Sequence, residues 1–200
     1  MRIVSILTIG LFLVSTGCAK APQEKALTLV NAAAVDATML ECLRAFAERE
    51  LHVPVRTLET PGLAGKESFQ TLEKSAEKVK TDSDVVLIVL SGINGDGKHL
   101  AVYPEKGLAL INAQVLYTED SEKFARRLER QVMRAAAFSF GLTPTPDPFC
   151  VTRDYTSLED LDHMGRNFSP PWQGRFAEEA ENRGLFPAEA GGEKRSPQTP

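Results

Sequence analysis

"DVVLIVLS", from Asp84 to Ser91, is an unbroken run of aliphatic and β-branched residues between two polar ends. A strand of this composition is apolar on both faces, which is typical of the centre of a sheet that helices cover on both sides. Strand patterns and helix patterns alternate ahead of this run along the chain. The sequence therefore predicts an α/β domain with a mixed sheet and packed helices.

Other segments have the short apolar or alternating pattern of strands. They are Ala26–Asn31, Val53–Glu59, His99–Pro104 and Gly107–Ala113. Apolar residues at helical spacing predict helices at Ala37–Glu50, Glu67–Lys80 and about Asp120–Phe140. The last of these helices has one apolar face, which we expect to pack on the core. That face carries Phe124, Leu128, Val132, Ala135 and Leu142.

The overall composition is that of an ordinary globular protein. The chain has 200 residues, of which 42% are hydrophobic and 25% are charged, as expected for one domain. Its formal net charge is -4, so it lacks the basic field that attracts phosphate backbones. We therefore expect no nucleic-acid partner.

The first residues have the order of a bacterial lipoprotein signal. Met1 and Arg2 supply positive charge, Ile3–Val14 is almost wholly apolar, and "STGC" follows, ending at Cys18. An apolar run this short is typical of a signal-peptide core rather than of a membrane span. The small residue before Cys18 resembles the lipobox of bacterial lipoproteins, although Ser15 stands where that motif has a larger aliphatic residue.

This resemblance implies a signal peptide at residues 1–17 and a lipid-modified Cys18 that begins a tether at residues 18–25. Acyl chains on Cys18 would hold the protein to the membrane without a spanning helix. Ala19 is not the aspartate that retains lipoproteins in the inner membrane. The resemblance thus implies the outer membrane and the periplasmic side of the cell envelope. Two alternatives stay open: a simple secretory signal with an incidental cysteine, and a buried N-terminal strand.

The thiols that remain after Cys18 are Cys42 and Cys150. In an oxidising compartment they can form one disulfide. Alternatively, Cys42 lies beside the apolar face of its helix and is a buried free thiol.

The C-terminal residues Pro187–Pro200 are small, polar and rich in Pro and Gly. Such a segment cannot bury enough apolar area to offset the entropy lost on ordering. We therefore expect the folded domain at residues 26–176 and a polar, disordered tail at residues 177–200.

A second stretch, "RQVMRAAAFSFGLTPTPDPFC" (Arg130 to Cys150), bears on function. It reads as a helix that ends at Gly141, where a left-handed cap is needed, and prolines then prevent the helix from resuming. Polar and aromatic residues form a second face beside the apolar one. This face carries Arg127, Gln131, Arg134 and Phe138.

Aligned by its glycine, this stretch resembles the archaemetzincins, zinc-dependent peptidases whose motif is H-E-x-x-H-x-x-G-x-x-H-C-x-x-x-x-C-x-M. Gly141 and Cys150 match the motif. The residues that would carry the chemistry are replaced. Arg134, Phe138 and Pro144 stand at the three histidine positions, Ala135 at the glutamate and Thr152 at the methionine. The resemblance implies a metzincin-like sheet with a degenerate active-site helix.

The resemblance continues into Ser157–Phe176, which is similar to the small C-terminal subdomain of that family. In the family, four cysteines hold a structural zinc ion there. Thr145, Cys150, Ser169 and Trp172 stand at these positions, so one thiol of four remains. We expect Phe168 and Trp172 to replace that zinc ion by hydrophobic packing.

The substitutions decide what chemistry to expect. Catalytic zinc needs imidazole or anionic ligands, and a guanidinium offers a positive charge and no lone pair. The chain has three histidines, His52, His99 and His163, in separate elements without ligand spacing. We therefore expect no cofactor and no catalytic residue, that is, an inactive relative of a zinc metallopeptidase. In its cleft, Phe138 would fill the metal's space and Arg134 would pair with Asp147 or Asp154.

The segment His99–Pro104 matches the strand along which metzincins bind substrates. An exposed sheet edge can accept an extended peptide after catalysis is lost. We therefore expect a peptide- or protein-binding or scaffolding module of the cell envelope. The alternatives are a zinc peptidase with non-standard ligands and a purely structural envelope lipoprotein.

Overall fold

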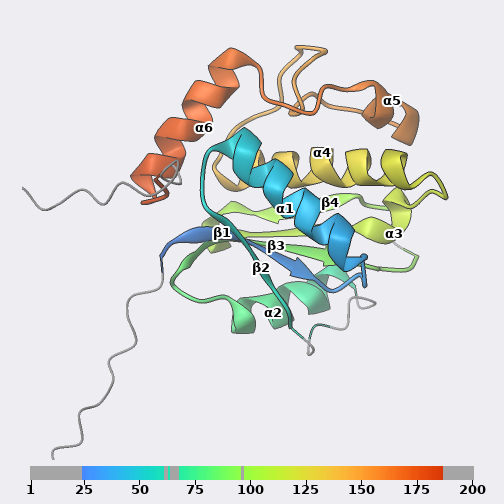
Figure 1. Ribbon diagram of the computed structural model, residues 1–200, viewed down its shortest axis with the longest axis horizontal. Coiled ribbons are helices and arrows are strands. Elements are labelled where there is room, and N and C mark those ends of the chain that lie inside the picture. The colour runs from blue at the N-terminus through green and yellow to red at the C-terminus, as the bar shows by residue number, and fades with distance from the viewer. Residues whose placement is uncertain (1–23, 61–62, 64–67, 96, 187–200) are drawn as a thin grey trace, which may run out of the picture.

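The computed structural model describes residues 24–60, 63, 68–95 and 97–186. Its centre is a five-stranded sheet in the order β2-β1-β3-β5-β4 (Figure 1). The strands are β1 (Ala26–Asn31), β2 (Val55–Leu58), β3 (Asp84–Ser91), β4 (Leu100–Tyr103) and β5 (Leu108–Asn112). β1, β2, β3 and β5 are parallel, and β4 is an antiparallel edge strand. The predicted α/β class and mixed sheet are confirmed.

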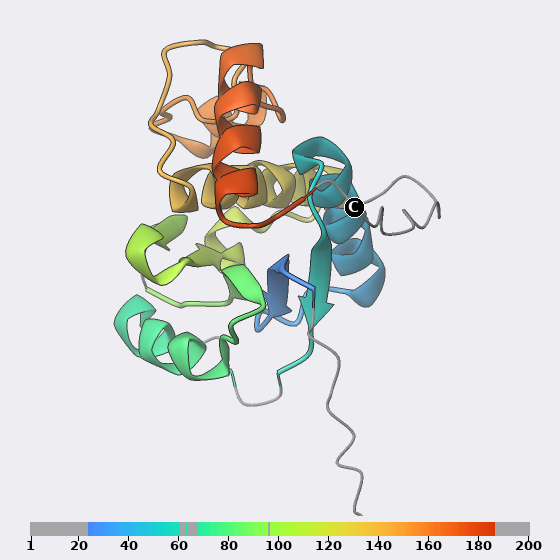
Figure 2. The ribbon, with the colours of Figure 1, turned by 90° about the vertical axis from the view of Figure 1, so that its left-hand side faces the viewer.

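The central strand β3 is apolar because both of its faces are covered. Val86, Ile88 and Leu90 belong to the larger part of the core, under helices α1 (Ala37–Leu51) and α4 (Ser121–Ser139). Leu87 and Val89 face the smaller part, under α2 (Phe69–Val79). Figures 1 and 2 show these helices as layers on opposite faces of the sheet.

A buried charge network ties the start of β3 to its neighbours. The Asp84 carboxylate is 2% exposed, accepts from Thr28 Oγ1 at 2.5 Å, and pairs with Arg56 Nη2 at 2.5 Å. Burial raises the pKa of Asp84, but the hydrogen bonds from Thr28, Arg56 and Thr81 outweigh it and lower that pKa below its ordinary value. The carboxylate form therefore stabilises the joined ends of β1, β2 and β3.

Helix α4 crosses the whole domain, and its limits lie one residue inside the predicted ones at each end. Asp120 caps its first turn by accepting from Lys123 N–H at 3.0 Å. Gly141 has φ of +81°, and its N–H and that of Leu142 return to the carbonyls of Phe138 and Ala137. This is a Schellman ending, which requires a left-handed residue at Gly141. The predicted apolar face, from Phe124 to Ala135, is buried.

The C-terminal segment forms a further layer on α4, made by α5 (Leu158–His163) and α6 (Pro170–Asn182) (Figure 2). Phe176 is fully buried, and its ring centroid lies 4.9 Å from that of Phe140 and 5.4 Å from that of Phe168. The predicted domain limit at residue 176 falls inside α6. Ala180 and Leu185 are buried beyond it, so the folded part extends further than the sequence indicated.

Both described thiols are free. Cys150 is buried, and Cys42 is exposed on α1. The disulfide alternative is therefore not formed. The second alternative, a buried Cys42, is also wrong, because the core side of α1 is made by other residues such as Leu40 and Leu43.

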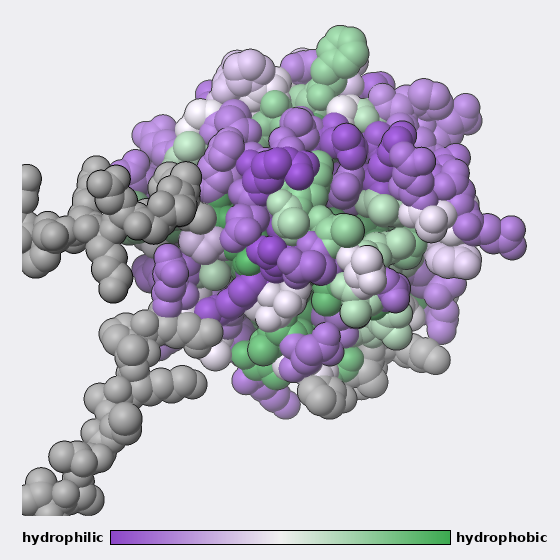
Figure 3. Space-filling view, in the orientation of Figure 1, coloured by the Kyte–Doolittle hydropathy of each residue, from purple (hydrophilic) through white to green (hydrophobic). Residues whose placement is uncertain are grey.

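The face that carries α1 is mainly hydrophilic, with apolar side chains in small groups between polar ones (Figure 3). Within the described ranges, every helix is too short or too polar to cross a membrane. The predicted signal peptide, the lipid-modified Cys18 and the tail at 187–200 lie outside the described residues.

Candidate functional site

A cleft of about 440 Å³ lies between the edge strand β4, helix α4 and the loop that precedes α5. Its size is within the range of small-molecule and peptide sites. The lining residues come from three segments far apart in sequence. They are Gly97, Lys98, His99, Leu100, Val102, Gln131, Arg134, Phe138, Tyr155 and Thr156.

The β4 side of the cleft is an open sheet edge, since β5 is the only described strand that pairs with β4. The carbonyl of His99 accepts from Asn112 N–H at 2.9 Å. Hydrogen-bonding direction alternates along an antiparallel strand, so Ala101 also turns its backbone groups to β5. Leu100 and Val102 therefore present their N–H and C=O groups outward, and both residues line the cleft.

Arg134 forms the floor on the α4 side and is 6% exposed. Its Nη1 donates to the carbonyl of Val151 at 2.9 Å and to that of Arg153. Its guanidinium carbon lies 5.0 Å from the centroid of the Phe138 ring and 4.9 Å from that of Tyr155. These contacts fix the guanidinium plane in the cleft wall.

The predicted ion pair of Arg134 with Asp147 or Asp154 is wrong. Main-chain carbonyls take the place of a carboxylate, while Asp147 accepts from Phe149 N–H at 2.9 Å in its own turn. Asp154 is exposed and acts on Arg134 only through its charge. Burial lowers the pKa of Arg134, as expected for a cation without a bonded carboxylate.

A hydrogen-bonded chain crosses the cleft from α4 to β4. Gln131 Nε2 donates to Tyr155 Oη at 2.7 Å, which lies 2.6 Å from His99 Nδ1. The Tyr155 hydroxyl can then donate a hydrogen bond to Nδ1, in which case the proton of the neutral imidazole is on Nε2. Burial, with the charges of Arg127 and Arg134, lowers the pKa of His99, so its ring is neutral at neutral pH.

Three solved structures resemble the whole domain. The archaemetzincin from Methanopyrus kandleri is 16% identical, with a TM-score of 0.64 over 81% of this chain and 98% of its own. A zinc-dependent peptidase from Methanocorpusculum labreanum is 14% identical, with a TM-score of 0.61 over 75% and 99%. The fold is that of the archaemetzincins. The archaemetzincin from Archaeoglobus fulgidus, solved with malonate, has a TM-score of 0.58 at 16% identity, over 75% of this chain and 99% of its own. No family model and no curated protein matches the sequence.

The archaemetzincin motif positions are only partly brought together. Arg134 and Phe138 line the cleft, whereas Pro144 is exposed and is not part of its lining. Ala135 packs in the core, and Thr152 is buried, with its hydroxyl 3.1 Å from Cys150 Sγ. The cleft thus keeps two of the three histidine positions of the motif.

These side chains do not fit a zinc ion. Zinc takes imidazole, thiolate or carboxylate ligands, and the two motif residues in the cleft are a guanidinium and a phenyl ring. His99 is a single donor whose Nδ1 is already bonded to Tyr155. His52 caps α1 and His163 bonds to the carbonyl of Glu159, both outside the cleft. Across the described ranges, no three His, Cys, Asp or Glu side chains gather in a metal-binding group.

The four positions that align with the structural-zinc cysteines of the archaemetzincin motif make other contacts here. Cys150 Sγ accepts from Ser169 N–H at 3.4 Å, and Thr145 Oγ1 accepts from Asp147 N–H at 3.3 Å. Trp172 Nε1 donates to the carbonyl of Thr143 at 2.8 Å. Burial raises the pKa of Cys150, but hydrogen bonds from Thr152 and Ser169 outweigh it and lower that pKa.

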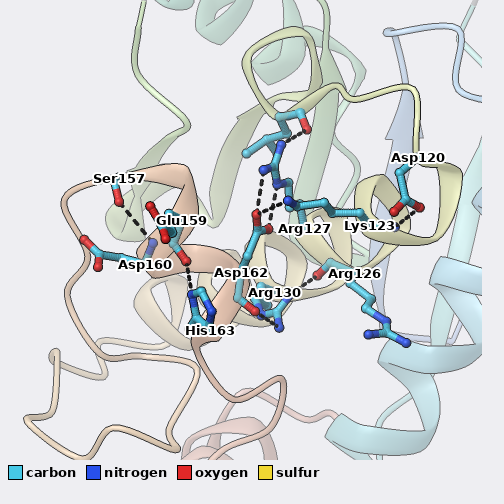
Figure 4. A network of polar contacts seen from close by, with 11 residues as sticks. Asp120, Lys123, Arg126, Arg127, Arg130, Ser157, Glu159, Asp160, Asp162 and His163 are labelled. Carbon is cyan, nitrogen blue, oxygen red and sulfur yellow. Dashed lines mark hydrogen bonds and ion pairs between the residues drawn. The ribbon is translucent and has the colours of Figure 1, made fainter.

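A salt bridge holds the C-terminal layer on α4 (Figure 4). Arg127 Nε and Nη2 donate to the two oxygens of Asp162 at 2.7 and 2.6 Å. Arg130, one turn further, donates to the carbonyls of Asp162 and Met164. The side chain of Arg127 lowers the pKa of Asp162. Side-chain contacts with α4 therefore hold the C-terminal layer in place beside the cleft.

The sequence indicated Arg134, Phe138 and the edge strand, but it missed Gln131 and Tyr155 as cleft residues. A signal for Gln131 was present, since it lies between Arg127 and Arg134 on one helix face. A polar face on a helix that is otherwise buried marks a site or a packed network. Tyr155 follows no such pattern, because it reaches the cleft from a loop.

Proposed function

We propose that this chain is a catalytically inactive protein of archaemetzincin fold that binds an extended peptide in the cleft between β4 and α4. The observation that carries the proposal is the side chain at the first motif position. Arg134 is a cation fixed at the place where the motif has a histidine ligand, and it repels a metal dication.

The peptide part of the proposal rests on the edge of the sheet. Leu100 and Val102 offer outward N–H and C=O groups next to a cleft large enough for side chains. A peptide that adds a strand to such an edge gains main-chain hydrogen bonds, and the neighbouring cleft selects its side chains. Pro104 ends the usable edge, so the bound segment is short.

The test exposes the full-length chain to a synthetic peptide library and identifies retained peptides by mass spectrometry. We expect retained peptides to be recovered uncut. Val102→Pro removes one outward N–H without breaking the pairing to β5, and should weaken retention at least tenfold. Val102→Thr keeps that N–H and is the matched control. Cleavage of the peptides, or equal retention by Val102→Pro, would contradict the proposal.

We further propose that Cys18 carries the lipid anchor that its sequence context implies. The protein would then act at the surface of a bacterial envelope membrane, probed by fractionating cells that produce the chain. Cys18→Ser should move the protein from the membrane fraction to the soluble fraction. Unchanged membrane association of this variant would rule out the anchor.

A further inference from the structure

One edge of the Arg134 guanidinium has no hydrogen-bond partner among the residues that the structure describes. Nη1 is bonded to the Val151 and Arg153 carbonyls. Nε is buried without a hydrogen-bond partner, and Nη2 makes no hydrogen bond to any described residue. Nε and Nη2 form the side of a guanidinium that binds the two oxygens of a carboxylate.

The same helix shows that edge in use. Arg127 lies two turns before Arg134 and places its Nε and Nη2 on the two oxygens of Asp162, as Figure 4 shows. Arg134 lines a cleft whose described lining residues include no Asp or Glu. A buried charged donor without a partner costs free energy, which a bound anion would remove.

A hydrogen-bond acceptor on the same side of the cleft, Gln131 Oε1, limits which anions can bind. Gln131 is fully buried, and its Oε1 has no hydrogen-bond partner within the described part of the chain. Oε1 repels a ligand made only of anionic oxygens, such as a free phosphate, but accepts from an N–H group. A ligand that carries a carboxylate next to an N–H would satisfy both Arg134 and Gln131.

We propose that the cleft binds the C-terminal carboxylate of a peptide, with the Nε–Nη2 edge of Arg134 as its recognition group and Gln131 Oε1 accepting the terminal N–H. The inference rests on the proposed peptide-binding function and names its ligand. The last residue of a peptide carries both groups on one carbon, and the cleft volume of about 440 Å³ accommodates such an end. Capture of a C-terminal carboxylate is a known way to read peptides.

The experiment measures binding to the unaltered full-length chain by nuclear magnetic resonance titration. Three N-acetylated tripeptides of valine and alanine serve as probes: one with a free C-terminus, its C-terminal amide, and an amide with one glutamate. We expect the free acid to bind at least tenfold more tightly than the amide. The acid should also shift the Arg134 Nε–H signal, which is assigned by its loss in Arg134→Lys.

Arg134→Lys keeps the positive charge but lacks the two-donor edge. It should lower the affinity for the acid at least tenfold and leave that for the amide unchanged. Because Arg134 is buried, Tyr155→Phe provides a second variant. This variant removes only the hydroxyl that is hydrogen-bonded to Gln131 and His99, so the Gln131 side chain is no longer held in place. It should weaken binding of the free-acid peptide, while that peptide still shifts the Arg134 Nε–H signal.

The outcomes separate this inference from the proposed function. Binding of the glutamate amide as tight as that of the free acid would overturn the C-terminal assignment, because the cleft would then recognise the carboxylate of an acidic side chain. Equal affinity of acid and amide overturns the inference, yet the proposed peptide binding stands. Absence of binding by all three probes overturns the inference, and the library experiment with Val102→Pro then decides the proposed function independently.

Discussion

Phe176→Ala tests whether apolar packing holds the C-terminal layer on α4. The Phe176 ring is fully buried. Its centroid lies 4.9 Å from that of the Phe140 ring and 5.4 Å from that of the Phe168 ring. A buried aromatic side chain covers about 150–250 Å², which at about 25 cal/mol per Å² is roughly 4–6 kcal/mol for the whole residue. Alanine keeps part of that area. We therefore expect unfolding to become easier by about 3–5 kcal/mol, the usual cost of such truncations.

Thermal unfolding followed by circular dichroism measures this change. For a chain of this length, 1 kcal/mol shifts Tm by about 2–4 °C, so the expected loss is roughly 6–20 °C. Phe149→Ala is the matched control, because that ring is 81% exposed and its removal should cost at most about 0.5 kcal/mol. Addition of a chelator should change neither Tm. A loss below about 1 kcal/mol in Phe176→Ala would refute the packing account.

Three further changes probe the scaffold. Asp162→Ala leaves the buried guanidinium of Arg127 unpaired and should cost about 3–5 kcal/mol in urea unfolding. Gly165→Ala should cost at least about 2 kcal/mol in the same assay, because a Cβ there would lie 1.7 Å from the carbonyl oxygen of Phe149. Folding lowers the pKa of Asp84, so its carboxylate stabilises the folded protein. This contribution is complete at pH values above the ordinary carboxyl pKa, about 4, and is lost as the pH falls through the lower pKa of the folded state. The free energy of unfolding should therefore fall on acidification, and it should fall less in Asp84→Asn than in the unaltered protein.

Each of these changes has a control or a contradicting result. Glu159→Ala, on the same helix as Asp162, removes an exposed carboxylate and should cost less than about 1 kcal/mol. Gly174→Ala meets no atom within 4 Å and lies inside α6, so it should stabilise by about 0.5–1 kcal/mol. A destabilised Gly174→Ala would contradict the described helix. If the unaltered protein and Asp84→Asn lost stability equally as the pH falls, this carboxylate would not govern the pH dependence of stability.

The sheet and the long helix could be predicted because their residues repeat with a strand or helix period. The run at Asp84–Ser91 is β3 with unchanged limits, and the α4 limits differ from the prediction by one residue at each end. α6 could not be predicted in this way. Phe176 and Ala180 are its only buried residues, too few for a periodic apolar pattern, so the domain limit was placed inside it.

The cleft, too, could be predicted only in part from the sequence. The motif positions located Arg134 and Phe138, since sequence spacing fixes where a helix places them. The partners of Arg134 could not be read from sequence, because tertiary folding brings the Val151 and Arg153 carbonyls from a loop on the far side of Gly141. Likewise, His99 and Tyr155 are 56 positions apart and meet only in the folded cleft.

The central claim is that the archaemetzincin fold persists here without the zinc ion. Elemental analysis of the full-length chain, purified without chelator and dialysed against zinc, tests that claim most directly. We predict a cooperatively folded protein without stoichiometric zinc, because the cleft presents a fixed guanidinium where the motif has an imidazole. One zinc ion per chain would contradict the account, and single substitutions of His52, His99, His163 and Cys150 would then locate its ligands.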